Sequence, residues 1–366
     1  MIGNQIHSVE DLIDNRYEIL CFVGEGGMQQ VYCALDSVLG RKVALKVPKN
    51  SSAQKRFKRS AVVSAKVNHP NVAKTLDYIE TDSSPYLIEE FISGKDLKEG
   101  LLQQLGIVDP YLTAKILHHL AKGVAASHNA GVIHRDLKPS NIMFAGEFNL
   151  SEIKITDFGI AKMAEEEISS ALEGGEESMS VSRTVVGALP YMAPEMLRDS
   201  QNAGKPSDIW ALGAMTYELL SGHKPFGSKI ADVVPKILAA EPPSRPHCID
   251  SKLQFQPLGN ELYTLVLECF NENPQNRPTA DDLVQKCENL CYPVVERQIG
   301  TCSYLHSAWS WGKISSDDGE TIFFHFDSVY GNKPTLGSRV CFSAFPGSPS
   351  QRAHPVIVIQ TSTVNP

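Results

Sequence analysis

The chain has 366 residues, of which 42% are hydrophobic and 21% charged, and its formal net charge is −8 at pH 7. A single hydrophobic core stops growing at about 250–300 residues, so this length predicts more than one domain. The negative charge argues against bulk attraction to nucleic acid or to an anionic membrane surface. No apolar run approaches the roughly 18 residues of a membrane-spanning helix, and the first residues do not form a secretory signal. With eight cysteines and no C-x-x-C pair, we expect a reduced, cytoplasmic chain with no membrane partner.

Taken in chain order, the predicted elements change character twice. The first 90 or so residues alternate apolar runs with turns, which predicts strands, whereas the periodicity of residues 54–67 predicts a helix. Helical periodicity then dominates, and the clearest helices are predicted at 111–128, 207–220 and 262–270. Six glutamates among serines and glycines make residues 163–183 a predicted long loop. Short β-like runs return in residues 298–366, which hold nine aromatic residues.

A glycine-rich stretch followed by a lysine indicates a phosphate site. Gly24, Gly26 and Gly27 lie between two predicted strands, and glycines let backbone amides approach phosphate oxygens because no Cβ intervenes. By itself such a stretch is more simply interpreted as a hairpin turn. The next predicted strand, however, contains the run Val-Ala-Leu-Lys that ends at Lys46, and this ammonium group can face the same phosphates.

Three further motifs follow in order. The run His-Arg-Asp-Leu-Lys-Pro-Ser-Asn occupies residues 134–141, Asp-Phe-Gly occupies 157–159 and Ala-Pro-Glu occupies 193–195. On these motifs, residues of about 17–290 resemble a bacterial eukaryotic-like (Hanks-type) Ser/Thr protein kinase. The resemblance implies a bilobal fold that transfers the γ-phosphoryl group of MgATP to protein hydroxyls.

The resemblance assigns roles residue by residue. It implies that Asp136 accepts the proton of the substrate hydroxyl and that Lys138, which is typical of Ser/Thr kinases, neutralises charge on the γ-phosphate. Asn141 and Asp157 would hold Mg²⁺, because their hard oxygens suit this ion. Lys46 would act in catalysis by holding the α- and β-phosphates. ATP would be bound by Gly24, Glu25, Gly26, Val31, Ala44, Lys46, Glu90, Ile92, Asn141 and Asp157.

Two further matches imply structural contacts within the C-terminal lobe. Glu195 is expected to pair with Arg277, and Asp208 is expected to anchor the backbone of the catalytic loop.

Three positions depart from the family's pattern. Gln29 replaces the third glycine of the loop, and Ala188 replaces a threonine that normally helps to orient the catalytic loop. Ser60 stands where a helix should present a glutamate to the phosphate-binding lysine. Turnover below that of a typical family member is therefore expected.

The missing helix glutamate leaves Lys46 without its usual ion-pair partner. No shift in register supplies one, because residues 47–76 contain no Asp or Glu. Lys46 is therefore expected to be positioned by Asp157, by the nucleotide itself, or by a carboxylate from elsewhere. Glu89 is aligned with the position that gates the back of the adenine pocket, where a glutamate is unusual.

Hydroxyl side chains gather toward the end of this predicted loop, beside an intact catalytic loop. We expect autophosphorylation at Ser178, Ser180, Ser182 or Thr184. A phosphate adds nearly two negative charges, which an arginine such as Arg135 can bind with two hydrogen bonds. The basic residues of the 46–74 window could also bind an anionic segment or a nucleic acid, although a solvated helix face is the simpler interpretation.

A second resemblance covers residues 298–366. An aromatic strand, Gly-x-Ile, an Asp-Asp-Gly turn and Ile-Phe-Phe-His-Phe follow one another between Gly300 and Phe326, and this pattern resembles a cold-shock domain, a five-stranded OB-type barrel. Such barrels stack single-stranded bases on exposed aromatic side chains. The stacking surface would comprise Tyr304, Trp311, Phe323, His325 and Phe326. Because the region carries four acidic and four basic residues, it lacks a basic groove, and a protein-binding, autoinhibitory or structural role stays open.

The sequence thus predicts an α+β chain in which a bilobal kinase fold, with an N-lobe at 17–92 and a C-lobe at 93–290, precedes a small all-β OB-type barrel at 298–366. The predicted function is that of a Ser/Thr protein kinase that uses ATP and Mg²⁺. The barrel would regulate or target the kinase by binding single-stranded RNA or DNA or a protein partner, and by contacting the basic 46–74 window. The alternative is a pseudokinase scaffold whose barrel does the binding. The sequence does not identify the protein substrate.

Overall fold

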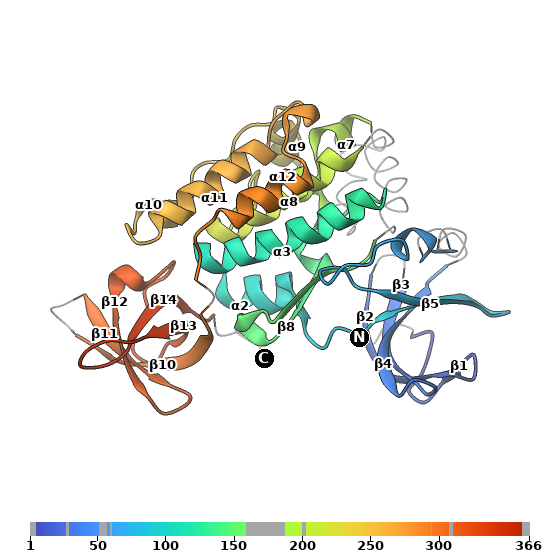
Figure 1. Ribbon diagram of the computed structural model, residues 1–366, viewed down its shortest axis with the longest axis horizontal. Helices are drawn as coiled ribbons and strands as arrows, with labels where there is room; N and C mark the ends of the chain where they lie inside the picture. The colour runs from blue at the N-terminus through green and yellow to red at the C-terminus, as the bar shows by residue number, and fades with distance from the viewer. Residues whose placement is uncertain are drawn as a thin grey trace.

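The structure, a computed structural model, describes residues 5–26, 29–50, 57–58, 61–158, 187–199, 203–293, 295–306 and 310–360. An N-terminal lobe built on a sheet, a helical C-terminal lobe and a small barrel follow one another along the chain, and Figure 1 shows the helical lobe between the other two. This order agrees with the predicted bilobal fold followed by a barrel.

The N-terminal lobe is a six-stranded antiparallel sheet with the strand order β1-β2-β3-β4-β6-β5. Its strands are β1 (Leu12–Ile13), β2 (Tyr17–Glu25), β3 (Gln29–Asp36), β4 (Arg41–Pro48), β5 (Thr75–Glu80) and β6 (Pro85–Glu90). Successive side chains of a strand point to opposite faces, so Val43, Leu45 and Val47 of β4 enter the core of one face. Ala44 and Lys46 consequently lie on the opposite face, toward the C-terminal lobe.

The second face of this sheet is covered by the described part of the predicted 54–67 helix. Residues 57–58 and 61–64 are helical. Phe57 and Ala61 pack against Leu87 of β6 and are almost completely buried. The helix prediction is confirmed for these residues, while Ser60 lies outside the described residues.

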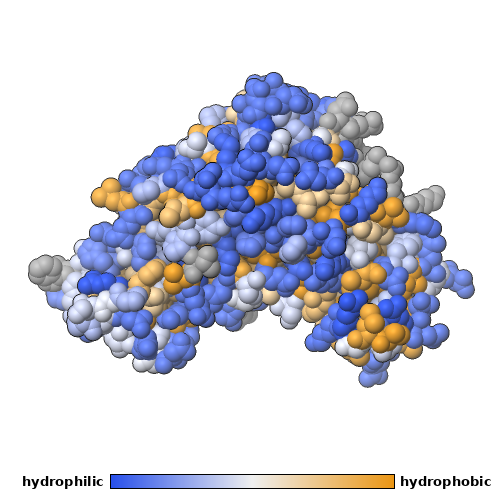
Figure 2. All heavy atoms as spheres, in the orientation of Figure 1, coloured by the Kyte–Doolittle hydropathy of each residue, from blue (hydrophilic) through white to orange (hydrophobic). Residues whose placement is uncertain are grey.

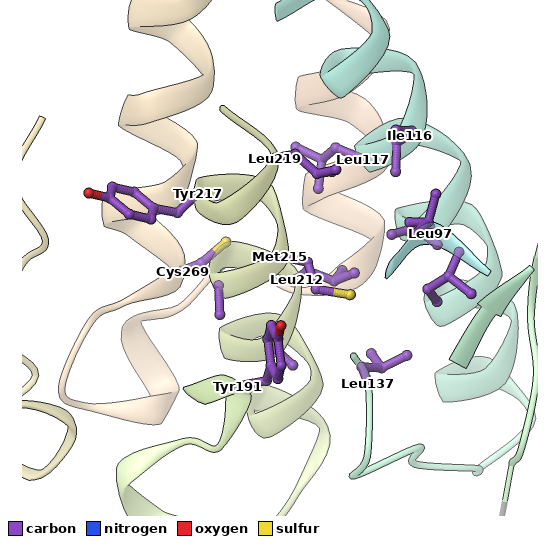
Figure 3. Close-up of a cluster of buried hydrophobic side chains, with 14 of the residues drawn as sticks. Leu97, Ile116, Leu117, Leu137, Tyr191, Leu212, Met215, Tyr217, Leu219 and Cys269 are labelled. Atoms are coloured by element: carbon purple, nitrogen blue, oxygen red, sulfur yellow. The ribbon is translucent and has the colours of Figure 1, made fainter. Parts of the chain in front are cut away.

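The C-terminal lobe is mainly helical. Its helices are α2 (Gln103–Leu105), α3 (Pro110–Asn129), α7 (Pro194–Arg198), α8 (Lys205–Ser221), α9 (Ile230–Leu238), α10 (His247–Asp250), α11 (Gln256–Cys269) and α12 (Ala280–Glu288), with a π-helical turn at Lys98–Leu102. The three helices expected from periodicity correspond to α3, α8 and α11 and are confirmed. Helix α8 is apolar on nearly all sides, and Figure 3 shows Leu117 of α3 and Leu212 and Leu219 of α8 in the core between these helices.

A small antiparallel sheet carries the catalytic segments. It consists of β7 (Lys95–Asp96), β8 (Ile142–Ala145) and β9 (Glu152–Ile155) in the order β7-β8-β9. The 134–141 motif ends where β8 begins, and Asp157 follows the end of β9. Because β8 and β9 are paired, the two motifs are held side by side.

The C-terminal unit is a closed barrel with the strand order β10-β11-β12-β14-β13. Its strands are β10 (Arg297–Leu305), β11 (Trp311–Ser316), β12 (Thr321–His325), β13 (Arg339–Phe345) and β14 (Arg352–Val358). Pairing is antiparallel except between β12 and β14. Ile314, Phe324 and Phe342 are fully buried inside it. A closed five-stranded barrel agrees with the prediction, and it begins one residue before the expected boundary.

The barrel packs against the C-terminal lobe. Tyr330 is buried, its hydroxyl donates to the Leu220 carbonyl at 2.9 Å, and its ring lies 5.0 Å from that of Phe255. Together with Cys341 and Ile357, Tyr330 extends the hydrophobic core of the helical lobe. For the described residues of the 46–74 window, the expected contact with the barrel is therefore wrong, because apolar packing places the barrel at the opposite end of the molecule from the sheet of the N-terminal lobe (Figure 1).

The surface in the orientation of Figure 2 is largely hydrophilic over the helical lobe. Among the described residues, no helix combines the length and the apolar character that a bilayer crossing needs. All eight cysteines lie in the described part of the chain as free thiols, and the five that are buried are Cys33, Cys269, Cys287, Cys302 and Cys341. These five pack as small apolar side chains.

Candidate active site

Lys46 and Asp157 meet between the two lobes. Lys46 Nζ lies 2.9 Å from Asp157 Oδ1, and the lysine side chain is 6% exposed. Burial disfavours the charged ammonium group, but the carboxylates of Asp157 and Glu89 outweigh burial and raise the pKa of Lys46. Burial likewise opposes ionisation of Asp157, but Lys46 holds the pKa of this carboxyl below its usual value. Both groups are therefore charged at neutral pH.

Glu89 is a second partner of Lys46 that the sequence did not identify. Its Oε2 lies 2.5 Å from Lys46 Nζ, and its side chain is 5% exposed. Sequence analysis aligned Glu89 with the back of the adenine pocket, and in the structure Glu89 pairs with Ala44 across β4 and β6. Two of the three expected ways of positioning Lys46, by Asp157 and by a carboxylate from elsewhere, are thus observed together.

The described part of the glycine-rich segment comprises the end of β2 and Gly26. The Gly26 amide donates to the Gln29 carbonyl at 2.9 Å, and a Cβ added at Gly24 or Gly26 would meet no atom within 4 Å. These glycines therefore leave open space above the site, as a phosphate requires. Glu25 is exposed and pairs with Lys49 at 3.0 Å, so its side chain is directed away from Lys46.

Gln29 reaches into the site from β3. Its Nε2 donates to Asp157 Oδ1 at 2.9 Å, while its Oε1 is buried with no partner among the described residues. The residue that replaces the third glycine thus contacts the same carboxylate as Lys46. Sequence analysis identified Gln29 only as a departure from the family's third glycine.

Asp208 anchors the catalytic loop, as predicted. From α8, its carboxylate accepts hydrogen bonds from the His134 amide at 2.9 Å and the Arg135 amide at 2.7 Å. These contacts stabilise a backbone in which Arg135 has a φ of 64°, a left-handed conformation that costs about 1–3 kcal/mol for a non-glycine residue. Asp157 has a φ of 62°, so left-handed backbone occurs on both sides of the site.

His134 connects the catalytic loop to the segment after β9. Its Nε2 donates to the Thr156 carbonyl at 2.8 Å, while its Nδ1 accepts from the Asp136 amide at 3.3 Å. The ring of Phe158 packs edge-on against His134, with centroids 4.6 Å apart. This packing fixes the spacing between the segments that carry Asp136 and Asp157.

Asp136, Lys138 and Asn141 form a compact cluster. Lys138 Nζ lies 2.9 and 2.8 Å from the two carboxylate oxygens of Asp136. Asn141 Nδ2 donates to the Asp136 carbonyl at 2.7 Å and to its Oδ2 at 3.1 Å. The predicted catalytic carboxylate is thus oriented by its own loop, with an ammonium group beside it.

The donor set suits Mg²⁺ bound together with phosphates. Asn141 directs its amide nitrogen toward Asp136, which leaves its oxygen for another partner, and Asp157 supplies a charged carboxylate. Within the described part of the chain, no three His, Cys, Asp or Glu residues form a metal cage. Mg²⁺ usually takes one or two protein oxygens and completes its shell with phosphates and water, so Asn141 and Asp157 fit this ion.

The remaining residues that were predicted to bind ATP lie at the edges of the candidate active site. Val31 is opposite Lys46 on β3, and Ala44 is opposite Glu89. The Glu90 amide donates to the Lys74 carbonyl at 2.9 Å, and Ile92, just beyond β6, is buried. The chain thus passes from one lobe to the other beside Ala44.

Two predictions concern residues away from the cleft. Arg277 makes two hydrogen bonds to Glu195, at 2.6 and 2.9 Å, so this predicted pair is confirmed. The four predicted phosphorylation sites, Ser178, Ser180, Ser182 and Thr184, lie outside the described residues. Their modification stays a prediction.

The predicted stacking residues of the barrel divide into two groups. Tyr304, Trp311 and Phe323 form an outward strip, with ring centroids 5.4 Å and 5.5 Å apart along it. His325 is exposed beside Trp311, its cross-strand neighbour. Phe326 does not join the strip, because its ring packs against the barrel core beside Phe324.

Comparison with known proteins adds independent information. A family model described as a protein kinase domain matches residues 17–287. The chain belongs to the protein kinase family. The predicted catalytic residues and the Lys46–Asp157 pair all lie within the matched residues, and the motif-based resemblance of residues 17–290 is confirmed at the level of the family.

Curated relatives of this kinase include bacterial Ser/Thr kinases. The chain is 34% identical over 279 residues to the probable serine/threonine-protein kinase PknB of Corynebacterium glutamicum, which covers 73% of this chain and 40% of that protein. It is 33% identical over 278 residues to the serine/threonine-protein kinase PrkC of Bacillus subtilis, covering 74% of this chain and 40% of that protein. This kinase therefore spans about two fifths of the length of these relatives.

Solved structures agree with this family assignment. The crystal structure of Rad53 1–466 in complex with AMP-PNP matches this kinase with a TM-score of 0.58 and 26% sequence identity. The match covers 74% of this chain and 64% of that chain.

Proposed function

We propose that this chain is an active Ser/Thr protein kinase that transfers the γ-phosphoryl group of MgATP to protein hydroxyls. The observation that carries the proposal is that the Asp136–Lys138–Asn141 cluster and the Lys46–Asp157 pair lie at the adjoining ends of the paired strands β8 and β9. The printed names of the bacterial relatives and the AMP-PNP bound to Rad53 support the activity and the nucleotide.

Each side chain has a distinct task in this reaction. The Asp136 carboxylate, oriented by Asn141, accepts the proton of the substrate hydroxyl. The ammonium of Lys138 stabilises charge that develops beside Asp136. Lys46 holds phosphate oxygens on the sheet side, and Asn141 and Asp157 would hold Mg²⁺. When bound, Mg²⁺ neutralises charge on the transferred phosphoryl group.

Phosphorylation assays with radiolabelled ATP and Mg²⁺ test this proposal. We expect labelling of the chain itself, mapped to Ser178, Ser180, Ser182 or Thr184, and of an added protein substrate. Asp136→Asn is expected to abolish labelling while the chain still binds MgAMP-PNP. A parent chain that binds nucleotide but transfers no phosphate would instead support the pseudokinase alternative.

A second proposal concerns the barrel, which we infer targets or regulates the kinase by binding single-stranded nucleic acid. The supporting observation is the strip of Tyr304, Trp311 and Phe323, which is extended by the guanidinium of Arg352 lying 5.2 Å from the Phe323 centroid. Bases stack on such rings largely without regard to sequence. A cold-shock-like role would follow from this surface, with a protein partner as the alternative occupant.

A further inference from the structure

We propose that Glu89 is the residue that positions Lys46 in this kinase, in place of the helix glutamate that the chain lacks. This inference rests on the proposed phosphoryl transfer. Glu89 contacts Lys46 and not the reacting atoms, so it is a positioning residue. Its effect on catalysis passes through the ammonium group, whose Nζ lies 2.5 Å from Glu89 Oε2.

The register of the sheet brings the two side chains together. Lys46 is paired with Leu87 across β4 and β6, and Ala44 is paired with Glu89. Lys46 and Glu89 are therefore diagonal neighbours on the same face, a separation that long side chains can span. The core face of β6 takes Tyr86 and Ile88, so alternation directs Glu89 to the cleft side.

Burial makes this pair a strong constraint. The side chains of Lys46 and Glu89 are 6% and 5% exposed. Removing one member of a buried ion pair leaves an under-compensated charge, which is far more costly than at the surface. Residues 47–76 contain no acidic residue, so the strand before the helix and the helix itself offer no substitute carboxylate.

Asp157 cannot be the only carboxylate that holds Lys46 during the reaction. Its Oδ1 already accepts from both Lys46 and Gln29, and its Oδ2 accepts from the Thr156 hydroxyl at 3.2 Å. Asp157 is also the carboxylate proposed to hold Mg²⁺. Glu89 gives Lys46 a second carboxylate partner, so Asp157 can bind the metal without leaving the ammonium group without a contact.

This arrangement changes how the lysine is held. A glutamate on a helix couples the lysine to the position of that helix, whereas Glu89 and Lys46 lie on strands that are hydrogen-bonded to each other. Lys46 is therefore positioned within one rigid sheet. We infer that placement of the lysine in this kinase does not depend on movement of the helix.

The test compares Glu89→Gln and Glu89→Asp with the parent chain and with Glu80→Gln. Glu80 is a matched acid-to-amide control, because it ends β5 in an exposed pair with Lys58. For each protein, kcat and the KM for MgATP are measured with a protein substrate, MgAMP-PNP affinity is measured by calorimetry, and folding is checked by thermal unfolding.

We expect Glu89→Gln to lower kcat/KM by about 10- to 100-fold, as loss of a charge-assisted contact implies. The loss should appear mainly as a higher KM for MgATP and weaker MgAMP-PNP binding. Glu89→Asp keeps the charge on a shorter side chain and should recover part of the affinity. Glu80→Gln should behave as the parent.

The outcomes separate this inference from the proposed function. If the parent chain transfers no phosphoryl group, the proposed function is overturned. The role of Glu89 is then decided only by comparing the MgAMP-PNP affinity of Glu89→Gln with that of the parent. Parental kcat, KM and affinity in Glu89→Gln overturn the inference and leave the function intact. If Glu89→Gln does not fold, a folded Glu89→Asp decides: reduced affinity supports the inference, and parental affinity overturns it.

Discussion

Arg297, at the start of the barrel, forms a buried ion pair with Asp109, the N-cap of α3. Its Nη2 donates to both carboxylate oxygens of Asp109 at 2.9 Å, and the two side chains are 6% and 0% exposed. Asp109 Oδ1 also accepts hydrogen bonds from the Tyr111 and Leu112 amides and so caps α3. One carboxylate therefore joins the first turn of a kinase helix to the first strand of the barrel.

Arg297→Ala is expected to lower the free energy of unfolding by about 3–5 kcal/mol, because it leaves the Asp109 charge buried and partly uncompensated. Urea denaturation of the full chain measures this loss. The control is Arg339→Ala, which removes a comparable but exposed pair with Asp317 and should cost about 0–1 kcal/mol. Equal effects of the two variants would mean that the barrel is not anchored through Asp109.

Gln29→Gly is expected to lower the KM for MgATP. Gln29 donates a hydrogen bond to Asp157, and that bond competes with metal binding at the same oxygen. A hydrogen bond to a charged group is worth about 1.5–3 kcal/mol, so its removal should lower the KM for MgATP by roughly 10- to 150-fold. Steady-state kinetics at varied MgATP measure the change. A higher KM would show that Gln29 helps to orient Asp157.

The stability of the chain is expected to fall as the pH is lowered from about 6.5 to about 4. Burial, together with the nearby Lys115, lowers the pKa of His119 to about 4. The ring Nδ1 accepts a hydrogen bond from Asn71 Nδ2 at 2.9 Å, which also requires the neutral form. Between these pH values the unfolded chain binds more protons than the folded chain, so acid favours unfolding.

His119→Gln tests this assignment, because glutamine offers an acceptor but no proton-binding site. After allowance for solvent screening at a partly exposed ring, the pH-dependent loss assigned to His119 is about 1–2 kcal/mol. Urea unfolding at several pH values should show a shallower slope for His119→Gln than for the parent. The exposed His247 provides a control, and a His247→Gln variant with the same reduced slope would contradict the assignment.

Trp311→Ala is expected to weaken binding of a single-stranded oligonucleotide by roughly 1–3 kcal/mol, the value of one stacked base. Trp311 lies in the middle of the strip, between Tyr304 and Phe323. Fluorescence anisotropy at low salt measures the affinity. Leu336→Ala, at an exposed apolar position of the barrel, should leave the affinity unchanged. Failure of the parent chain to bind would favour a protein partner.

Contiguous motifs made much of the kinase predictable. The 134–141 run carries the predicted catalytic aspartate, the lysine and the asparagine close together in the sequence. Their proximity in space therefore follows from the local path of the backbone. Hydrophobic periodicity likewise identified α3, α8 and α11, because apolar residues that recur with the helical period are sufficient to indicate a buried helix face. The resemblance to a cold-shock domain implied an exposed aromatic surface on the barrel, although not that Phe326 packs against the barrel core.

Only the tertiary structure decided which carboxylate holds Lys46 and where the barrel lies. Glu89 is far from Lys46 in the chain, and the two meet because β6 pairs with β4 in one register, which no local pattern encodes. The barrel lies against the C-terminal lobe because Tyr330 enters an apolar core and Arg297 finds a buried carboxylate. The sequence alone determined the chemistry of each motif, whereas the long-range packing of strands and domains determined which charges face each other.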